Sequence, residues 1–238
     1  MSAMPLQHEE VYYPTSDGKP MAETPIHLAE MVYLITALQQ RYRDVPDVYA
    51  IGNMMFYYVE GDARSVISPD VFLVKGIPKD VRRDTFQLWK EKTPCLVIEI
   101  TSRSTRREDI HRKRDLYERM GVEEYFLHDP RGEYLRPALQ GYRLVGGRYQ
   151  PVTPAPDGSL ISRTTGLRLL PGKESLRLID LESGEPLPSF QEVQEAYQEV
   201  QEAYQEESAA RRVAEERARV AEEELARLRR ELESRGKS

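Results

Sequence analysis

Cysteine is nearly absent from the sequence, and so are long hydrophobic runs. Cys95 is the single cysteine among 238 residues, which excludes an intramolecular disulfide framework. Because Cys95 opens an apolar segment, we interpret it as a core thiol in a reducing compartment. No apolar stretch reaches membrane-spanning length, and residues 1–10 carry neither a basic segment nor the apolar centre of a signal peptide. These absences predict a cytoplasmic protein without a membrane partner.

Positive charge is also scarce. The chain contains 34 Lys and Arg residues against 40 Asp and Glu residues, a formal net charge of -6. It therefore lacks the global positive field of many nucleic-acid-binding proteins, and any contact with a nucleic acid must be local. The candidate surface is a basic segment after residue 102, in which we expect Arg103, Arg106, Arg107 and Arg112 to contact a phosphate backbone.

Several common catalytic signatures are missing as well. The sequence has no glycine-rich phosphate loop and no serine nucleophile elbow. His111 and His128 lack ligand spacing with other histidines or cysteines, which argues against a structural zinc site. The informative residues are instead acidic.

A hydrophobic content of 39% is sufficient for one domain-sized core with an appendage. We expect a globular domain over residues 1–188 and a helix over residues 189–238, where the composition changes abruptly. The sequence QEVQEAY at residues 191–197 recurs letter for letter at residues 198–204, which is a heptad repeat.

The seam of this heptad helix is apolar at both ends and charged in its middle. With Tyr197 at an a position, Val193, Val200 and Tyr204 also lie on the seam, and the far end is rich in Leu and Ala. Glu207 and the a-position arginine that follows it interrupt the seam. We favour a homodimer through a C-terminal coiled coil. The alternatives are a solvated single helix and a helix folded back onto the globular domain.

Within the globular part, helical and strand patterns alternate. The sequence predicts amphipathic helices over residues 25–42 and 108–120, the second closed by Gly121. A strand, a helix and a further strand over residues 95–130 form a βαβ-like unit, which favours parallel pairing. The result is a mixed α/β (α+β) domain. The other expected elements are a hairpin over residues 47–60 with a turn at Gly52-Asn53, a strand ending near residue 75, a short helix or ordered loop over residues 79–92, and antiparallel strands over residues 134–170.

Two carboxylates stand out within these strand patterns. Asp70 follows a proline at the start of one apolar run, and Glu99 interrupts another. A charge inside a buried strand is costly unless it is paired or bound to metal. Asp70 and Glu99 on neighbouring strands could jointly hold Mg²⁺, which takes one or two protein carboxylates and completes its shell with water and substrate phosphate. The implied chemistry is metal-assisted phosphodiester hydrolysis.

Such chemistry also needs a lysine near the metal. The commonest position is two residues after the glutamate, but Thr101 occupies it. The best substitute is Lys113, because an amphipathic helix packed on the sheet could carry it back toward the strand ends.

At this point the residues resemble a known family. The stretch 98–109, continued through Lys113, Tyr117 and the EYFLHDP segment 124–130, is similar to the Uma-two family of endonucleases, as is Ser68-Pro-Asp-Val71. That family is related to the PD-(D/E)XK nuclease superfamily, whose restriction-endonuclease-like fold is a mixed sheet flanked by helices. The resemblance spans roughly residues 17–170 and leaves the heptad tail uncovered. It implies DNA as the substrate, Mg²⁺ or Mn²⁺ as the cofactor, and Asp70 and Glu99 as metal ligands. It further implies Lys113 as the displaced lysine and Glu30 as a helix-borne acid.

Each of these residues has a structural alternative. Asp70 could shape a turn, and Glu99 could pair with an arginine such as Arg106 or Arg107. Lys113 could belong to a solvated helix face, and Glu30 could solvate a helix edge. The competing function is a noncatalytic nuclease-fold module that recruits a partner through its coiled coil, which the threonine in place of the lysine and the acidic net charge would suit.

Overall fold

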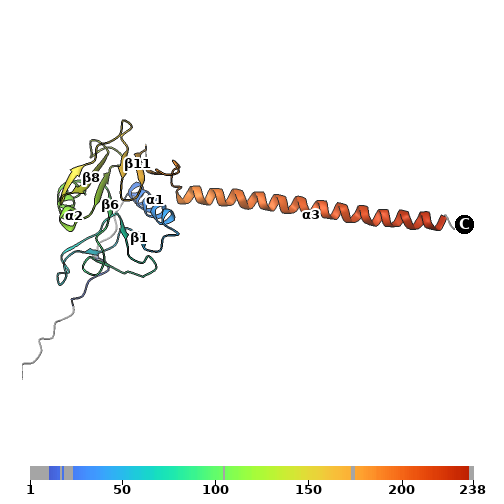
Figure 1. The fold of residues 1–238 in the computed structure, drawn as a ribbon, viewed down its shortest axis with the longest axis horizontal. Helices are drawn as coiled ribbons and strands as arrows, with labels where there is room; N and C mark the ends of the chain where they lie inside the picture. Colours follow the sequence, from blue (N-terminus) through green and yellow to red (C-terminus); the bar gives the residue numbers. More distant parts are fainter. Residues whose placement is uncertain (1–10, 17, 19–23, 104, 173–174, 236–238) are drawn as a thin grey trace, which may run out of the picture. The chain divides into compact units, whose positions relative to one another are not determined.

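The computed structural model describes residues 11–16, 18, 24–103, 105–172 and 175–235. The chain forms two compact units, residues 1–189 and residues 190–238. Its helices and strands, labelled in Figure 1, are α1 (Pro25–Arg41), β1 (Val48–Ile51), β2 (Phe56–Tyr57), β3 (Val66–Ile67), β4 (Val71–Lys75), β5 (Phe86–Gln87), β6 (Leu96–Ile100), η1 (Glu108–Lys113), α2 (Arg114–Met120), β7 (Glu124–His128), β8 (Leu139–Val145), β9 (Arg148–Pro151), β10 (Leu160–Ser162), β11 (Leu167–Pro171), β12 (Leu176–Asp180) and α3 (Phe190–Arg235). This is the mixed α+β fold that the sequence predicts.

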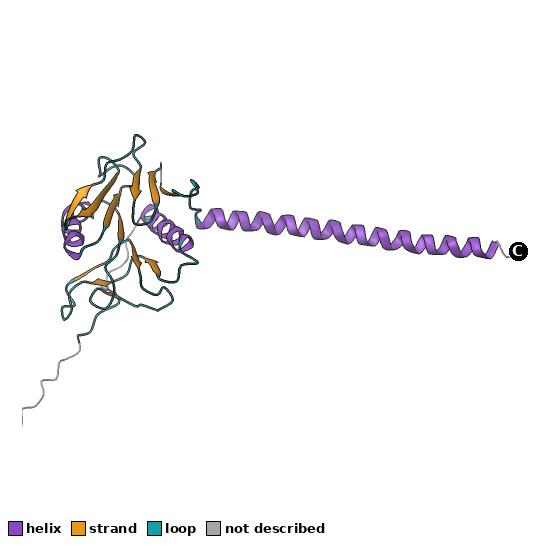
Figure 2. Cartoon of the chain, in the orientation of Figure 1, coloured by secondary structure: helices purple, strands orange, loops and turns teal. Residues whose placement is uncertain are grey.

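The first unit is built around a six-stranded mixed sheet. Its strand order is β1-β4-β6-β7-β8-β9, and within it only β6 and β7 run parallel. The connection between these two strands contains η1 and α2, as the βαβ pattern predicts (Figure 2). Gly121 closes α2 in the left-handed conformation, with φ of 80°. The predicted second helix is therefore confirmed, but its first part is a π-helix.

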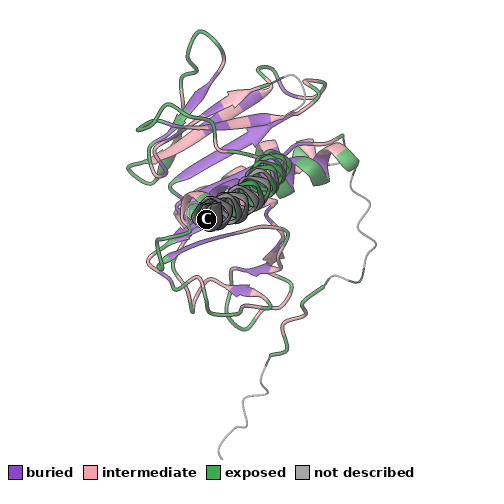
Figure 3. Ribbon diagram, turned by 90° about the vertical axis from the view of Figure 1, so that its right-hand side faces the viewer, coloured by how far each residue is buried: buried purple, intermediate pink, exposed green. Residues whose placement is uncertain are grey.

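Successive residues of the central strands point to opposite faces of this sheet. Leu96, Ile98 and Ile100 of β6 pack in one hydrophobic cluster with α1 and the small sheet β10-β11-β12. Val97 packs in the other, with Tyr117 of α2 and with residues of a third sheet, β3-β2-β5. Figure 3 shows the central strands as buried segments. Because the period is two, Glu99 belongs to the α2 face of the sheet.

The predicted hairpin over residues 47–60 is wrong. Strand β1 pairs with β4 and not with β2, which lies in a different sheet. Glycine is needed at position 52 for a reason other than a hairpin turn. A Cβ atom at Gly52 would lie 1.8 Å from the carbonyl oxygen of Asp70. The chain turns at Asn53, where φ is 49°, and the amide of Asn53 donates to the carbonyl of Pro69 at 2.8 Å. Gly52 therefore allows β1 to end against the segment that carries Asp70.

The remaining expectations concern the core, a loop and the tail. Cys95 is buried, as predicted for a core thiol. Of the two alternatives for residues 79–92, the structure has the ordered loop, with turns around the short strand β5 and no helix. In the second unit, α3 is one helix of 46 residues. Among the described residues, no helix has the length and apolar character needed to cross a membrane.

Candidate active site

Asp70 and Glu99 meet on the α2 face of the central sheet. The antiparallel register of β4 and β6 pairs Val71 with Ile98. Asp70, which directly precedes β4, therefore lies opposite Glu99 of β6. The amide of Asp70 lies 3.4 Å from Oε2 of Glu99. The amide of Ile100 donates to Oδ2 of Asp70 at 2.7 Å. Two carboxylates that are 29 residues apart in the chain are thereby held by backbone geometry at the end of one strand pair.

Lys113 reaches this strand end from η1. Its amine lies 2.9 Å from Oε2 of Glu99 and 3.0 Å from Oδ1 of Asp109. The hydroxyl of Tyr117 donates to the other oxygen of Glu99 at 2.6 Å. The lysine is almost fully buried, at 9% exposure, so the alternative of a solvated helix face is wrong for Lys113. Glu99 pairs with this lysine and not with an arginine.

The electrostatics of the cluster depend on burial and on mutual attraction. Complete burial raises the pKa of Glu99 well above its usual value, and the positive charge of Lys113 opposes the rise. Burial disfavours the charged lysine, but Glu99 and Asp109 outweigh it and hold the pKa of Lys113 above its ordinary value. Burial would raise the pKa of Asp70, yet the hydrogen bond from His27 and the charge of Lys113 hold it below its usual value. The acidic partners therefore favour a charged amine within this cluster.

Sequence reasoning missed His27 and Asp109. The ring Nε2 of His27 lies 3.2 Å from Oδ1 of Asp70, in a pair that is largely buried. Thr24 caps α1 and accepts a hydrogen bond from the amide of His27, which fixes His27 in the first turn, but this cap does not indicate which strand end His27 meets. Asp109 is four residues before Lys113, the spacing of an ion pair along one helix face.

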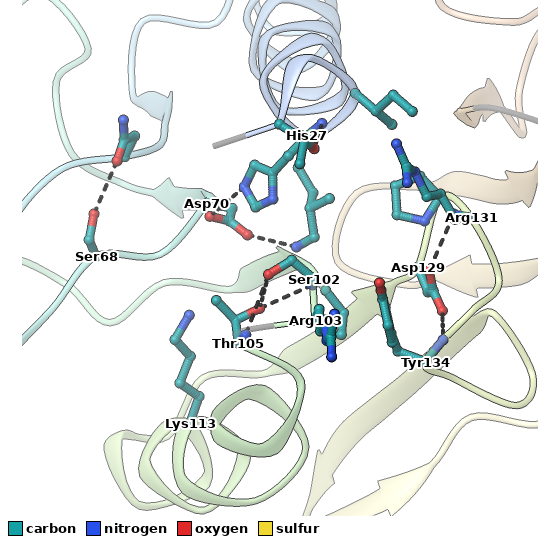
Figure 4. A pocket seen from close by; sticks show the side chains of 16 residues that line it. His27, Ser68, Asp70, Ser102, Arg103, Thr105, Lys113, Asp129, Arg131 and Tyr134 are labelled. Atoms are coloured by element: carbon teal, nitrogen blue, oxygen red, sulfur yellow. Dashed lines mark hydrogen bonds and ion pairs between the residues drawn. The ribbon is translucent and has the colours of Figure 1, made fainter. Parts of the chain in front are cut away.

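The cluster borders a pocket of about 340 Å³. His27, Asp70 and Lys113 line one part of it, and Arg103 and Tyr134 line another (Figure 4). Glu99 lies behind this lining, fully buried. The pocket lies where the loops after β6 and β7 leave the sheet, at the carboxyl ends of its two parallel strands.

The predicted phosphate-binding arginines do not all face this pocket. Arg103 lines it, and Arg106 lies 5.6 Å from the ring centroid of the lining residue Tyr134. Arg107 is exposed outside the lining, and Arg112 is paired with Glu108 along the helix. The structure therefore brings two of the four arginines to the site.

Glu30 lies in a different environment from the other predicted acids. Its Oε1 accepts a hydrogen bond from the amide of Leu176 at 2.7 Å and lies 3.5 Å from Nε2 of His128. It does not line the pocket, and the side chain that α1 directs to Asp70 is His27.

The donor set at this site suits a hard divalent cation. Mg²⁺ takes one or two protein carboxylates and keeps several waters, and Asp70 and Glu99 provide two carboxylates at one strand end. The part of the chain that the structure describes contains no group of three or more His, Cys, Asp or Glu residues that could hold a metal. Asp70 and Glu99 could hold an ion completed by water and phosphate, whereas the described residues form no closed cage of protein ligands.

Comparison with known proteins identifies the family of the chain. Residues 2–171 match the model of the Uma2 family, described as "Putative restriction endonuclease", and the chain belongs to that family. A solved structure, described as a "putative nuclease belonging to DUF820" from Anabaena variabilis ATCC 29413, is similar with 16% identity and a TM-score of 0.44. The match covers 62% of this chain and 76% of that one. No curated protein matches the chain.

Proposed function

We propose that this protein is a metal-dependent endonuclease that hydrolyses phosphodiester bonds in DNA. The observation that carries the proposal is the convergence of Asp70, Glu99 and the Lys113 amine beside one pocket, with the amine 2.9 Å from the glutamate. Membership of a family described as restriction endonucleases supports the same reaction.

Each residue has a role that follows from its contacts. Asp70 and Glu99 would hold Mg²⁺ or Mn²⁺, which when bound would supply a Lewis acid for the phosphate and an activated water. Lys113 carries its positive charge to the pocket wall, where its amine can orient water and stabilise charge on the phosphate. His27 and the amide of Ile100 fix the two oxygens of Asp70.

Plasmid cleavage tests this proposal. Supercoiled plasmid and single-stranded DNA are each incubated with the full chain in Mg²⁺, in Mn²⁺ and in EDTA, beside Glu99→Gln and Lys113→Met. We expect cleavage that requires metal and falls roughly 100-fold or more in both variants, as for the loss of one group that stabilises charge in a transition state. Because Arg82 is exposed, Arg82→Gln serves as the control for losing one charged side chain on the surface. Circular dichroism establishes that each variant is folded, and equal cleavage by wild type and folded Glu99→Gln would exclude a catalytic role for Glu99.

One observation favours the noncatalytic alternative. Both carboxylate oxygens of Asp70 already accept hydrogen bonds or lie beside His27, and Thr101 holds the position where the lysine is commonest. Calorimetric titration with Mg²⁺ separates the two functions, because a noncatalytic module predicts no metal-dependent heat, whereas the enzyme predicts heat that Glu99→Gln removes.

The tail supports a second part of the proposal, a homodimer through α3. The seam residues Val193, Tyr197, Val200 and Tyr204 are all exposed in the single chain. Large apolar side chains in a regular heptad are buried when two such helices associate.

A further inference from the structure

A rigid loop after β7 displays Tyr134 at the pocket. The carboxylate of Asp129, which is 1% exposed, accepts hydrogen bonds from the amides of Arg131, Tyr134 and Leu135. Leu135 is itself buried and anchors the end of the loop. A buried carboxylate bonded to three amides of one loop fixes the backbone of that loop, so the position of the Tyr134 ring is set in advance of any ligand.

Positive charge surrounds this ring. The guanidinium of Arg106 covers the ring, 5.6 Å from its centroid, while Arg103 and Arg131 line the same pocket (Figure 4). A hydrogen bond with Glu133 raises the pKa of the Tyr134 hydroxyl, and the charges of Arg103 and Arg131 oppose the rise. Glu133 is also 3.9 Å from Arg131, so one acid offsets part of the charge of the three arginines.

We propose that Tyr134, backed by Arg106 and flanked by Arg103, is a stacking subsite for one unpaired nucleotide of single-stranded DNA. The inference rests on the proposed function and names its substrate class. An aromatic ring beside guanidinium groups is the combination that binds a base by stacking and its phosphates by charge.

The size of the pocket suits one unpaired nucleotide. Its volume of about 340 Å³ lies at the lower end of the range of sites for small ligands, roughly 300–1,000 Å³. A nucleotide whose phosphate enters this pocket beside Asp70 and Lys113 would leave the stack of a duplex, and its base would lose its stacking neighbours. Tyr134 lines the same pocket and replaces one of those neighbours.

Binding without metal tests the subsite separately from hydrolysis. The probes are a fluorescein-labelled oligothymidine 12-mer and a labelled 12-bp duplex, titrated with the full chain in EDTA and followed by fluorescence anisotropy. The variants are Tyr134→Ala and Tyr134→Phe, which keeps the ring, with Tyr12→Ala as the control because Tyr12 is 78% exposed and lies outside the pocket lining.

We expect Tyr134→Ala to weaken single-strand binding roughly 5- to 100-fold, the range for loss of one base–aromatic stack. Tyr134→Phe and Tyr12→Ala should bind like the wild type, and the duplex should bind more weakly than the single strand. Unchanged binding by Tyr134→Ala, tighter binding of the duplex, or no binding of the oligothymidine would each overturn the subsite. If only the stacking subsite is wrong, plasmid cleavage will still depend on Glu99 while Tyr134→Ala binds the single strand like the wild type. If only the nuclease proposal is wrong, single-strand binding will still depend on Tyr134 while no metal-dependent cleavage occurs.

Discussion

Glu30 and His128 are a buried acid and a buried base that lie side by side. Replacing one of them at a time should give variants whose free energies of unfolding change with pH in opposite directions. Both side chains are 1% exposed, and Oε1 of Glu30 lies 3.5 Å from Nε2 of His128. Burial raises the pKa of Glu30 to about 7, although the amide of Leu176 opposes the rise. Burial lowers the pKa of His128 to about 4, against the attraction of Asp129. Between about pH 4 and 7 the folded protein therefore keeps the proton on Glu30 and leaves His128 neutral.

The signs follow from comparing each group with its unfolded value. Folded Glu30 keeps its proton above its unfolded pKa of 4.5, so its stabilising contribution is complete below pH 4.5 and is lost as the pH rises through about 7. Unfolded His128 gains a proton near pH 6.5 and the folded form only near 4, so its contribution is complete above pH 6.5 and is lost as the pH falls. Between pH 4.5 and 6.5 the free energy of unfolding falls with pH because of Glu30 and rises with pH because of His128, so the two slopes cancel in the wild type.

Each substitution should remove one slope and leave the other. In Glu30→Gln the free energy of unfolding should rise by about 3 kcal/mol between pH 4 and 6.5, since each pKa unit corresponds to about 1.36 kcal/mol. In His128→Asn it should fall by about the same amount between pH 4.5 and 7. The amide of Glu30→Gln retains an oxygen for Leu176, which limits other losses.

Urea unfolding at several pH values measures these slopes. The fluorescence of Trp89, the only tryptophan, follows the globular unit without a signal from α3. If Glu30→Gln and the wild type show the same pH slope of the free energy of unfolding, folded Glu30 does not keep its proton above pH 4.5 as argued. The same variant also separates structure from catalysis: folded Glu30→Gln should keep plasmid cleavage at pH 7.5, whereas a catalytic helix-borne acid requires its loss.

Two further perturbations test the tail and the approach of β1 to the site. A chain ending at Ser189 should sediment as a monomer while the full chain sediments as a dimer, and an unchanged oligomeric state would exclude dimerisation through α3. Gly52→Ala should destabilise the globular unit by about 3 kcal/mol in urea unfolding, because its Cβ would meet the Asp70 carbonyl at 1.8 Å, and a loss below about 0.5 kcal/mol would contradict this close approach.

The sequence predicted those parts of the fold that depend on local periodicity. The helix at residues 25–41 and the parallel strands β6 and β7 follow from apolar spacing and from the connection between them. The pairing of β1 was mispredicted because a Gly-Asn pair signals any tight turn, whether the chain reverses into a hairpin or passes close to another backbone. Only the tertiary approach of Asp70 to Gly52 distinguishes the two cases.

The site was predictable to the extent that its residues break a pattern. Glu99 could be found because a charge in a buried strand is anomalous, and Asp70 because it precedes the neighbouring strand. His27 and Asp109 break no pattern, since polar residues in the first turn of a helix are ordinary. Their roles depend on which strand end each helix meets, and single-sequence reasoning does not supply that information.

The position of Lys113 illustrates how a displaced lysine can be held. Thr101 lies on the same face of the sheet as Glu99, where a lysine would extend along its own strand, and its short side chain leaves the space to another element. Lys113 enters from η1 with Glu99 on the strand and Asp109 on its own helix as partners. Because π-helical turns are rare and often occur at functional sites, the departure from α-helical geometry at this lysine supports a functional role. Glu99 of β6 and Asp109 of η1 together hold the amine of Lys113. The position of the amine in the site is therefore determined by how η1 packs against β6.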